Sequence, residues 1–290
     1  MERNEFIKSA GVLFISSMID LKTFGNTFSG NENTPRMPVL FVGHGNPMNA
    51  LYDNPFTRSL HKLNKELPKP KAILVISAHW LTRGTFVLNS PYPKTIYDFG
   101  GFPPELSKIK YEAPGSQEFA KKTQEMVKSA SVQLDHDWGF DHGAWTILHH
   151  LYPAADIPVY QLSIDYNKPV SYHYNLAKEL SELRNKGVLI IGSGNIVHNL
   201  SMISWDDPNY KYDWCIEFDE TVKKYLNAHQ FDELVNYQKM GNAAKLSVPT
   251  NDHYLPMIYA IGLQQKGENI SYTYEGIEMG SISMRCFRIG

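Results

Sequence analysis

Short apolar runs, separated by longer amphipathic stretches, are the feature that most constrains the fold of this 290-residue chain. From Pro38 onward each run is flanked by turn residues and is too short to form a helix of its own. This alternation is typical of buried strands connected by helices, an arrangement that gives parallel sheets. The sequence therefore predicts a single α/β domain with a central, mostly parallel sheet flanked by helices. The predicted strands are residues 39–42, 72–76, 159–164 and 188–191.

The stretches between and after these runs have a recognisable periodicity of their own. Residues 174–184 carry apolar side chains at helical spacing and are followed by Gly187, as expected of a crossover helix. Residues 90–114 are rich in Pro, Gly and Tyr and fit neither period, so they are predicted to form a long loop that lines a substrate pocket. Further helices are expected at residues 214–226 and 253–263, and further strands at 270–274 and 281–289.

The N-terminal part of the chain lacks this alternation. Residues 37–290 are expected to form the one domain, and residues 1–36 an N-terminal extension. Within the extension, Arg3 and Lys8 precede a short apolar run and a polar segment, a pattern similar to a degenerate export signal. Because no cleavage site of small residues stands out, a cytoplasmic location is expected, with export as the alternative.

Charge, hydropathy and cysteine content exclude several classes of protein. The formal net charge is -2 and the lysines are scattered, so a nucleic-acid partner is not expected. No stretch approaches the roughly 20 apolar residues of a membrane span, so no membrane partner is expected either. Cys215 and Cys286 are too few for a disulfide framework and lack metal-binding spacing. Any metal must therefore be bound by histidine or carboxylate.

Three histidines follow predicted strands. His44 comes directly after the first strand, between two glycines, and His79 follows the second strand. His198 lies a few residues beyond the strand at 188–191. Ligands of parallel sheets bind beyond the carboxyl ends of the strands, so these imidazoles can converge on one site. A tight turn at His44 and a backbone hydrogen bond at His79 are the alternative, structural interpretations.

Two further histidines stand in loops or at a helix start. His253 lies near the start of a predicted helix, where the preceding Asp252 is expected to cap the helix, or alternatively to fix an imidazole tautomer. His142 lies in a predicted loop rich in Gly and aromatic residues, where Asp141 or Asp137 either orients it for proton transfer or is a solvated charge. The other six histidines are interpreted as structural or surface residues: His61, His136, His149, His150, His173 and His229.

Six blocks, in the same order along the chain, resemble those of the DODA-type family of extradiol aromatic ring-opening dioxygenases, within the LigB-like class. The resemblance extends from about residue 37 to the C-terminus. The blocks are GHGNPM at 43–48, SAHW at 77–80, YDFGGFP at 97–103, DHGAW at 141–145, GNIVHNL at 194–200 and DHYLP at 252–256.

The resemblance implies an oxidoreductase that opens the ring of a catechol such as DOPA with O2. It implies that His44, His79 and His253 bind one divalent metal, that His198 is a fourth ligand or a catalytic residue, and that His142 has an acid–base role. Where many extradiol enzymes have a carboxylate ligand, this sequence offers His253. An all-histidine site suits Zn2+ as well as Fe2+. Because zinc has no accessible redox chemistry, Fe2+ is expected if oxygen is activated.

Two other functions use the same ligands. A zinc hydrolase would use the metal to activate water, but the chain has neither a His-Glu-x-x-His helix nor a Gly-x-Ser-x-Gly elbow. A non-enzymatic, Memo-like metal-binding protein is the third interpretation. Six aromatic residues near the blocks are candidates for stacking on a substrate ring, with core packing as the alternative: Trp80, Tyr97, Phe99, Phe102, Trp138 and Trp145. The sequence indicates neither the natural catechol nor the oligomeric state.

Overall fold

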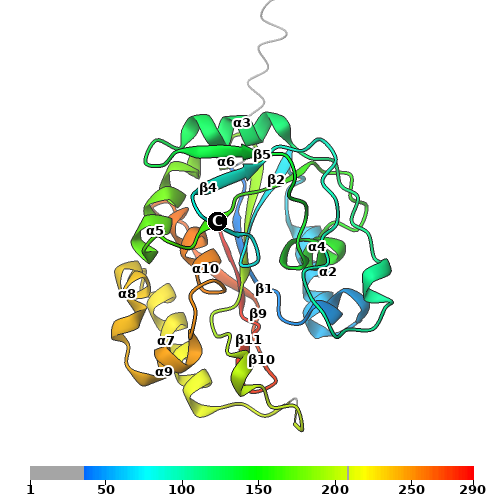
Figure 1. Cartoon of the computed structure of the whole chain (residues 1–290). Helices are drawn as coiled ribbons and strands as arrows, with labels where there is room; N and C mark the ends of the chain where they lie inside the picture. Colours follow the sequence, from blue (N-terminus) through cyan, green and yellow to red (C-terminus); the bar gives the residue numbers. More distant parts are fainter. Residues whose placement is uncertain (1–35, 208) are drawn as a thin grey trace, which may run out of the picture. The chain divides into compact units, whose positions relative to one another are not determined.

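A six-stranded sheet runs through the middle of this computed structural model, which describes residues 36–207 and 209–290 (Figure 1). The strand order is β6-β2-β8-β1-β12-β9. The first four strands are mutually parallel, β12 is antiparallel to β1, and β9 is antiparallel to β12. The expected α/β class with a mostly parallel sheet is confirmed. The strands are β6 (Val159–Gln161), β2 (Ala72–Ser77), β8 (Val188–Gly194), β1 (Val39–Gly43), β12 (Cys286–Ile289) and β9 (Ile270–Tyr274).

Helices cover both faces of the sheet because neighbouring residues of each strand point to opposite sides. Phe41 of β1 belongs to one apolar cluster, and Leu40 belongs to the other. The Phe41 cluster includes residues of α3, α5, α7 and α10, whereas the Leu40 cluster includes residues of α2 and α4 (Figure 1). These helices are α2 (Pro55–Glu66), α3 (Gln117–Met126), α4 (His142–Leu151), α5 (Val170–Glu179), α7 (Asp213–Asn227) and α10 (Leu255–Gly262).

Smaller elements connect these layers. β3 pairs with β7, β4 with β5, and β10 with β11, each as a two-stranded unit. The short strands are β3 (Leu81–Thr82), β4 (Thr85–Leu88), β5 (Val132–Asp135), β7 (Ile164–Asp165), β10 (Ile277–Glu278) and β11 (Ile282–Ser283). The short helices are α6 (Ser181–Asn185), α8 (Phe231–Val235), α9 (Asn242–Ser247) and the 3-10 turns η1 (Pro47–Leu51), η2 (Leu106–Lys108), η3 (Leu200–Met202) and η4 (Tyr237–Lys239).

Three expected elements are divided. The run at 159–164 forms β6 and β7, because the amide of Ser163 donates to the carbonyl oxygen of Phe86 at 2.8 Å and the chain leaves the main sheet there. The helix expected at 174–184 begins earlier, at Val170, and is interrupted at Leu180. The strand expected at 281–289 forms β11 and β12. Apolar periodicity located these segments but did not locate the interruptions, which depend on contacts with distant strands.

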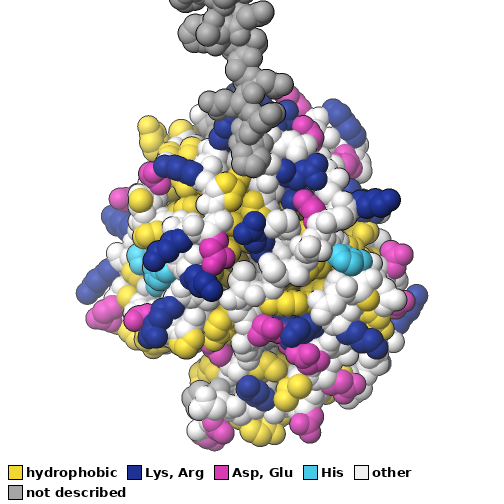
Figure 2. Space-filling model, turned by 180° about the vertical axis from the view of Figure 1, so that it is seen from behind, with side chains coloured by type: hydrophobic (Ala, Val, Ile, Leu, Met, Phe, Trp, Pro, Cys, Tyr) yellow, Lys and Arg dark blue, Asp and Glu magenta, His cyan; other side chains and the backbone are white. Residues whose placement is uncertain are grey.

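The described residues carry no large patch of one charge sign on the face drawn in Figure 2, where basic and acidic side chains are interspersed. None of the helices in residues 36–290 that the structure describes is long and apolar enough to cross a bilayer. The described residues form one compact unit. The expected export signal lies outside the described residues.

Two glycines of β8 allow the chain around the start of α10 to approach the sheet closely. A Cβ atom at Gly192 would lie 2.2 Å from the carbonyl oxygen of Pro256, and one at Gly194 would lie 2.2 Å from the carbonyl oxygen of His253. Both distances are far below van der Waals contact, so no larger residue fits without backbone movement. The glycines therefore allow the backbone of His253 to pack against the end of β8.

We expect Gly192→Ala to destabilise the protein by about 1–3 kcal/mol, because the added methyl group meets backbone that has to move. Urea denaturation measures the change in the free energy of unfolding. Gly100→Ala is the matched control, since a Cβ there meets no atom within 4 Å, and its effect should stay within about 0.5 kcal/mol. Equal stability of the two variants would contradict the close approach at β8.

Candidate metal centre

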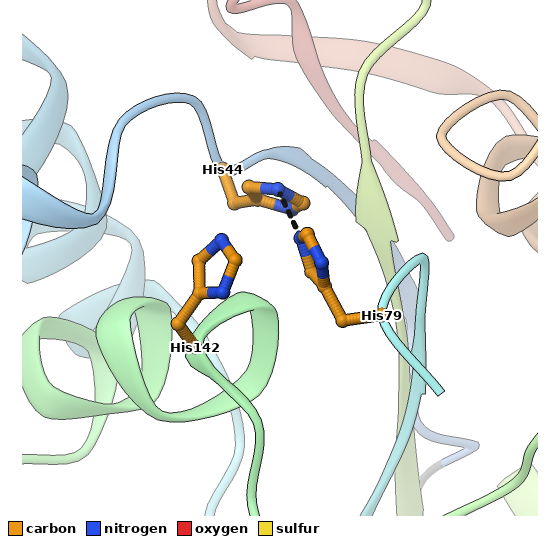
Figure 3. Close-up of side chains that lie close together, drawn as sticks. All are labelled: His44, His79 and His142. Carbon is orange, nitrogen blue, oxygen red and sulfur yellow. Dashed lines mark hydrogen bonds between the residues drawn. The ribbon is translucent and has the colours of Figure 1, made fainter. Parts of the chain in front are cut away.

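Five histidines gather at the carboxyl edge of the parallel strands. His44 directly follows β1, His79 follows β2 by two residues, and His253 lies just before α10. The ring centroids of these three are 5.0 to 5.3 Å apart in every pair. His142, at the start of α4, turns its ring toward His44 and His79 (Figure 3). His198 follows β8 and stacks on His253.

The strand order explains why residues so distant in sequence meet. β8 pairs with β1 on one side and with β2 on the other. His44 and His79 therefore flank the end of β8, where Gly192 and Gly194 leave space. Ring nitrogens of these two residues approach closely, with Nε2 of His44 and Nε2 of His79 3.1 Å apart. The rings of His44 and His79 contact each other and that of His253, and His198 reaches this group through its stacking on His253. His142 contacts His44 and His79.

Hydrogen bonds fix the orientation of the His44 ring. Its Nδ1 lies 3.0 Å from the hydroxyl oxygen of Ser193. That hydroxyl donates its proton to the carbonyl oxygen of Gly143 at 2.5 Å, so it accepts from Nδ1 of His44. The proton of a neutral His44 is then on Nδ1, and the lone pair on Nε2 faces His79.

A carboxylate plays the same part for His253, whose Nδ1 donates a short hydrogen bond to Asp252. Oδ2 of Asp98 lies 3.5 Å from Nδ1 of His79. The cap expected from Asp252 is wrong: the residue preceding α10 is Tyr254, and no side chain caps this helix start. Asp252 has the alternative role, that of holding an imidazole. In His253, as in His44, the hydrogen bond at Nδ1 leaves the lone pair of the neutral ring on Nε2.

Burial keeps the central histidines neutral. Desolvation, followed by the other histidines of the cluster, lowers the pKa of His44 and of His79 well below the usual value. Burial by itself would raise the pKa of Asp98, but hydrogen bonds from His142 outweigh it and lower this pKa. Neutral imidazoles beside ionised carboxylates are the protonation states that bind divalent metals.

The donor set fits a divalent transition metal. Two nitrogens that each lie about 2.0–2.1 Å from a tetrahedral ion are roughly 3.3 Å apart, close to the 3.1 Å between Nε2 of His44 and of His79. Ligand atoms of His44, His79 and His142 lie within 4.8 Å of one another, as do those of His198, Asp252 and His253. The structure therefore offers two neighbouring groups of donors, and the ring of His253 lies beside those of His44 and His79.

His142 is the first residue of α4 and does not lie in a loop, in contrast to the expectation. Asp98 holds it twice: one carboxylate oxygen accepts the backbone N–H of His142 and the other lies near its Nδ1, both at 2.9 Å. Asp141 instead caps α4 by accepting from the amide of Ala144 at 3.2 Å and is wholly buried. Asp137 is exposed, as its alternative interpretation expected. The residue that orients His142 is therefore Asp98.

His198 lies face to face with His253, with ring centroids 3.5 Å apart and an interplanar angle of 6°. The lone pair of an imidazole nitrogen lies in the ring plane, so the lone pairs of these two stacked rings lie in nearly parallel planes and would not point at the same ion. Burial, followed by the charge of His253, lowers the pKa of His198 to about 3, so its ring is neutral as well.

Two functional residues were not identified from the sequence. Asp98 lies within one of the six blocks and Ser193 lies between the glycines of β8, but the sequence pattern assigned no role to either side chain. Of the aromatic candidates, Phe99 packs edge-on against His142 at 5.6 Å. Trp80 is 2% exposed and stacks on Trp138, and Trp145 is fully buried, so these three serve packing.

Comparisons with known proteins show the family to which the chain belongs. Residues 37–285 match the family described as the catalytic LigB subunit of aromatic ring-opening dioxygenase. A protein of Escherichia coli K12 named 4,5-DOPA dioxygenase extradiol is 47% identical over 262 residues, covering 89% of this chain and 96% of the relative. A protein of the same name from Portulaca grandiflora is 36% identical over 259 residues, covering 84% and 94%. The crystal structure of an uncharacterized Escherichia coli K12 protein is similar with a TM-score of 0.78 and 45% identity, covering 88% of this chain and 100% of that one.

We expect Ser193→Ala to weaken metal binding by roughly 10- to 100-fold, because the acceptor that fixes the His44 ring is lost. Equilibrium dialysis against Zn2+ measures this affinity. Ser247→Ala is the matched control: its hydroxyl is also buried but has no hydrogen-bond partner in the described part of the chain. If both variants bind zinc like the parent protein, Ser193 does not support the centre.

Proposed function

This chain belongs to the family of the catalytic LigB subunit of aromatic ring-opening dioxygenases, and on that basis we propose that it opens the ring of a catechol such as DOPA with O2. The observation that carries the proposal is the cluster of His44, His79 and His253. Their ring centroids lie 5.0 to 5.3 Å apart in every pair, and an oxygen atom lies within 3.5 Å of Nδ1 in each ring. The curated relatives from Escherichia coli and Portulaca grandiflora support DOPA as the first substrate to test.

We propose that these three histidines hold one divalent metal. The donor chemistry suits Zn2+ and Fe2+ alike. A bound Fe2+ supplies the redox chemistry that a reaction with dioxygen needs, and Zn2+ does not. Fe2+ is therefore the proposed metal of the working enzyme. Burial of His44 and His79 contributes by keeping both rings deprotonated at neutral pH.

His142 is proposed to transfer protons without binding the metal. Asp98 accepts the proton on Nδ1 of His142, which leaves Nε2 to face the cluster. A carboxylate in this position stabilises the imidazolium that forms when Nε2 takes a proton, as in other His–Asp pairs. Nε2 of His142 can thus accept a proton from a catechol hydroxyl and return one as the ring opens.

His198 is proposed to face the substrate and not the metal, because of its stacking on His253. In its neutral form the ring offers a lone pair to a catechol hydroxyl. The two histidines stand on different sides of the cluster: His142 packs against His79 and His198 packs against His253. We propose that they contact the two ends of the bound catechol diol.

The proposed partners are small molecules, the catechol and O2, and neither nucleic acid nor a membrane. The interspersed surface charges support this. A cytoplasmic location is proposed as well, since Cys215 and Cys286 are both free thiols. Residues 37–290 are the proposed catalytic domain.

Iron-reconstituted protein is expected to consume O2 with DOPA and to form a yellow semialdehyde, because ring opening beside the diol extends the conjugation of the product. An oxygen electrode and visible absorbance measure both events. Protein loaded with zinc is the control and should consume no oxygen. Hydrolysis of a test ester without oxygen uptake, in iron-replete protein, would favour the zinc hydrolase; the absence of any turnover across a panel of catechols would favour a binding protein.

His142→Ala should keep its metal while turnover falls by roughly 10²–10⁴-fold, the loss typical of a missing general acid or base. Asp98→Asn should show a smaller loss in the same direction, since the ring remains but loses its carboxylate. Metal analysis and kcat are measured on the same samples. His136→Ala, at an exposed position, is the control. Metal loss in His142→Ala would make His142 a ligand or a support of one, and full activity would leave proton transfer to His198 alone.

A further inference from the structure

A second group of histidines lies away from the candidate metal centre, on the two helices of one face. His61 belongs to α2, and His149 and His150 belong to the last turn of α4. The ring of His150 is 5.1 Å from that of His61 and 5.4 Å from that of His149, measured between centroids. Figure 2 shows histidine side chains at the surface on the side where α2 and α4 lie. The sequence analysis had interpreted all three as structural or surface residues.

The ring nitrogens of this group are arranged for ligation. Nε2 of His150 donates to the carbonyl oxygen of Asn49 at 2.8 Å, so the lone pair of the neutral ring is on Nδ1. That Nδ1 lies 3.2 Å from Nε2 of His61. A histidine ligand typically donates its second ring N–H to a carbonyl or carboxylate, and His150 already does so.

This arrangement repeats that of the candidate metal centre. There, His44 and His79 have their Nε2 atoms 3.1 Å apart, and Nδ1 of His44 is bound by an oxygen. The 3.2 Å between His61 and His150 is likewise close to the roughly 3.3 Å between two nitrogen ligands of a tetrahedral ion. The two pairs share no residue, so they are separate donor sets.

We propose that His61 and His150, with His149 as a third donor, form a second site for a Zn2+-class ion that links α2 to α4. His61 is exposed and gives the ion a path from solvent, whereas His150 is 9% exposed and fixed by Asn49. His149 is half-buried, with its ring centroid 5.4 Å from that of His150. Water completes the coordination.

Counting bound zinc tests the proposal. Full-length protein is stripped with a chelator, equilibrated with Zn2+ at pH 7.5 by dialysis, and analysed for metal by atomic absorption. The parent protein should bind two equivalents, and His61→Ala should bind one. His44→Ala should retain the equivalent held by His61, and the double variant His44→Ala/His61→Ala should retain none. His136→Ala, another exposed histidine, should bind two equivalents like the parent.

A second readout is independent of the proposed function. In the His44→Ala background, Zn2+ should raise the thermal unfolding midpoint, because ligand binding to the folded state stabilises it, and adding His61→Ala should abolish the increase. Circular dichroism checks that each variant is folded. Equal zinc content with and without His61 overturns the second site, whatever happens at His44. If His44→Ala loses one zinc ion and retains the one that depends on His61, the second site is supported. This result does not depend on whether the protein opens any catechol.

Discussion

The hydroxyl of Ser193 holds together the three elements on which the candidate metal centre depends. It accepts from Nδ1 of His44, at the end of β1, and donates to the carbonyl oxygen of Gly143, in α4. Ser193 itself belongs to β8, between the glycines that admit His253. One buried hydroxyl thereby fixes the orientation of a ligand ring, the start of the helix that carries His142, and the strand against which both pack. Such a group has to be fully bonded, since an unpaired buried hydroxyl costs free energy.

A second polar network, centred on Asp141, attaches α4 to the sheet. Asp141 is wholly buried and accepts from the hydroxyl of Ser77 at 2.6 Å and from the amide of Gln161 at 2.7 Å, in addition to capping α4. Desolvation raises the pKa of this carboxyl despite those bonds. A buried carboxyl adds little to stability on average. Its place here is explained by geometry, because it holds the first turn of α4, and with it His142, against β2 and β6.

The electrostatics of the cluster follow from the same burial. Five imidazoles in close contact would repel one another strongly if protonated, and desolvation disfavours the charged form in the same sense. The neighbouring Asp98 and Asp252 remain ionised because histidine N–H groups donate to them, which lowers the pKa of each. The centre thus consists of neutral imidazoles next to the ionised carboxylates of Asp98 and Asp252. Such an environment is suited to a cation.

The sequence alone determined the strands β1, β2 and β8, the crossover connection, the long loop and the strand-end positions of His44 and His79, because apolar periodicity and turn residues are local signals. The block resemblance added His253 and His142. Only the tertiary structure decided which group holds each ring. Ser193 is 149 residues from His44, and Asp98 is 44 residues from His142. The stacking of His198 on His253 and the contact of His61 with His150 could not be predicted from the sequence either. Hydrogen-bond partners of this kind depend on strand order and helix docking, and no local pattern in the chain encodes them.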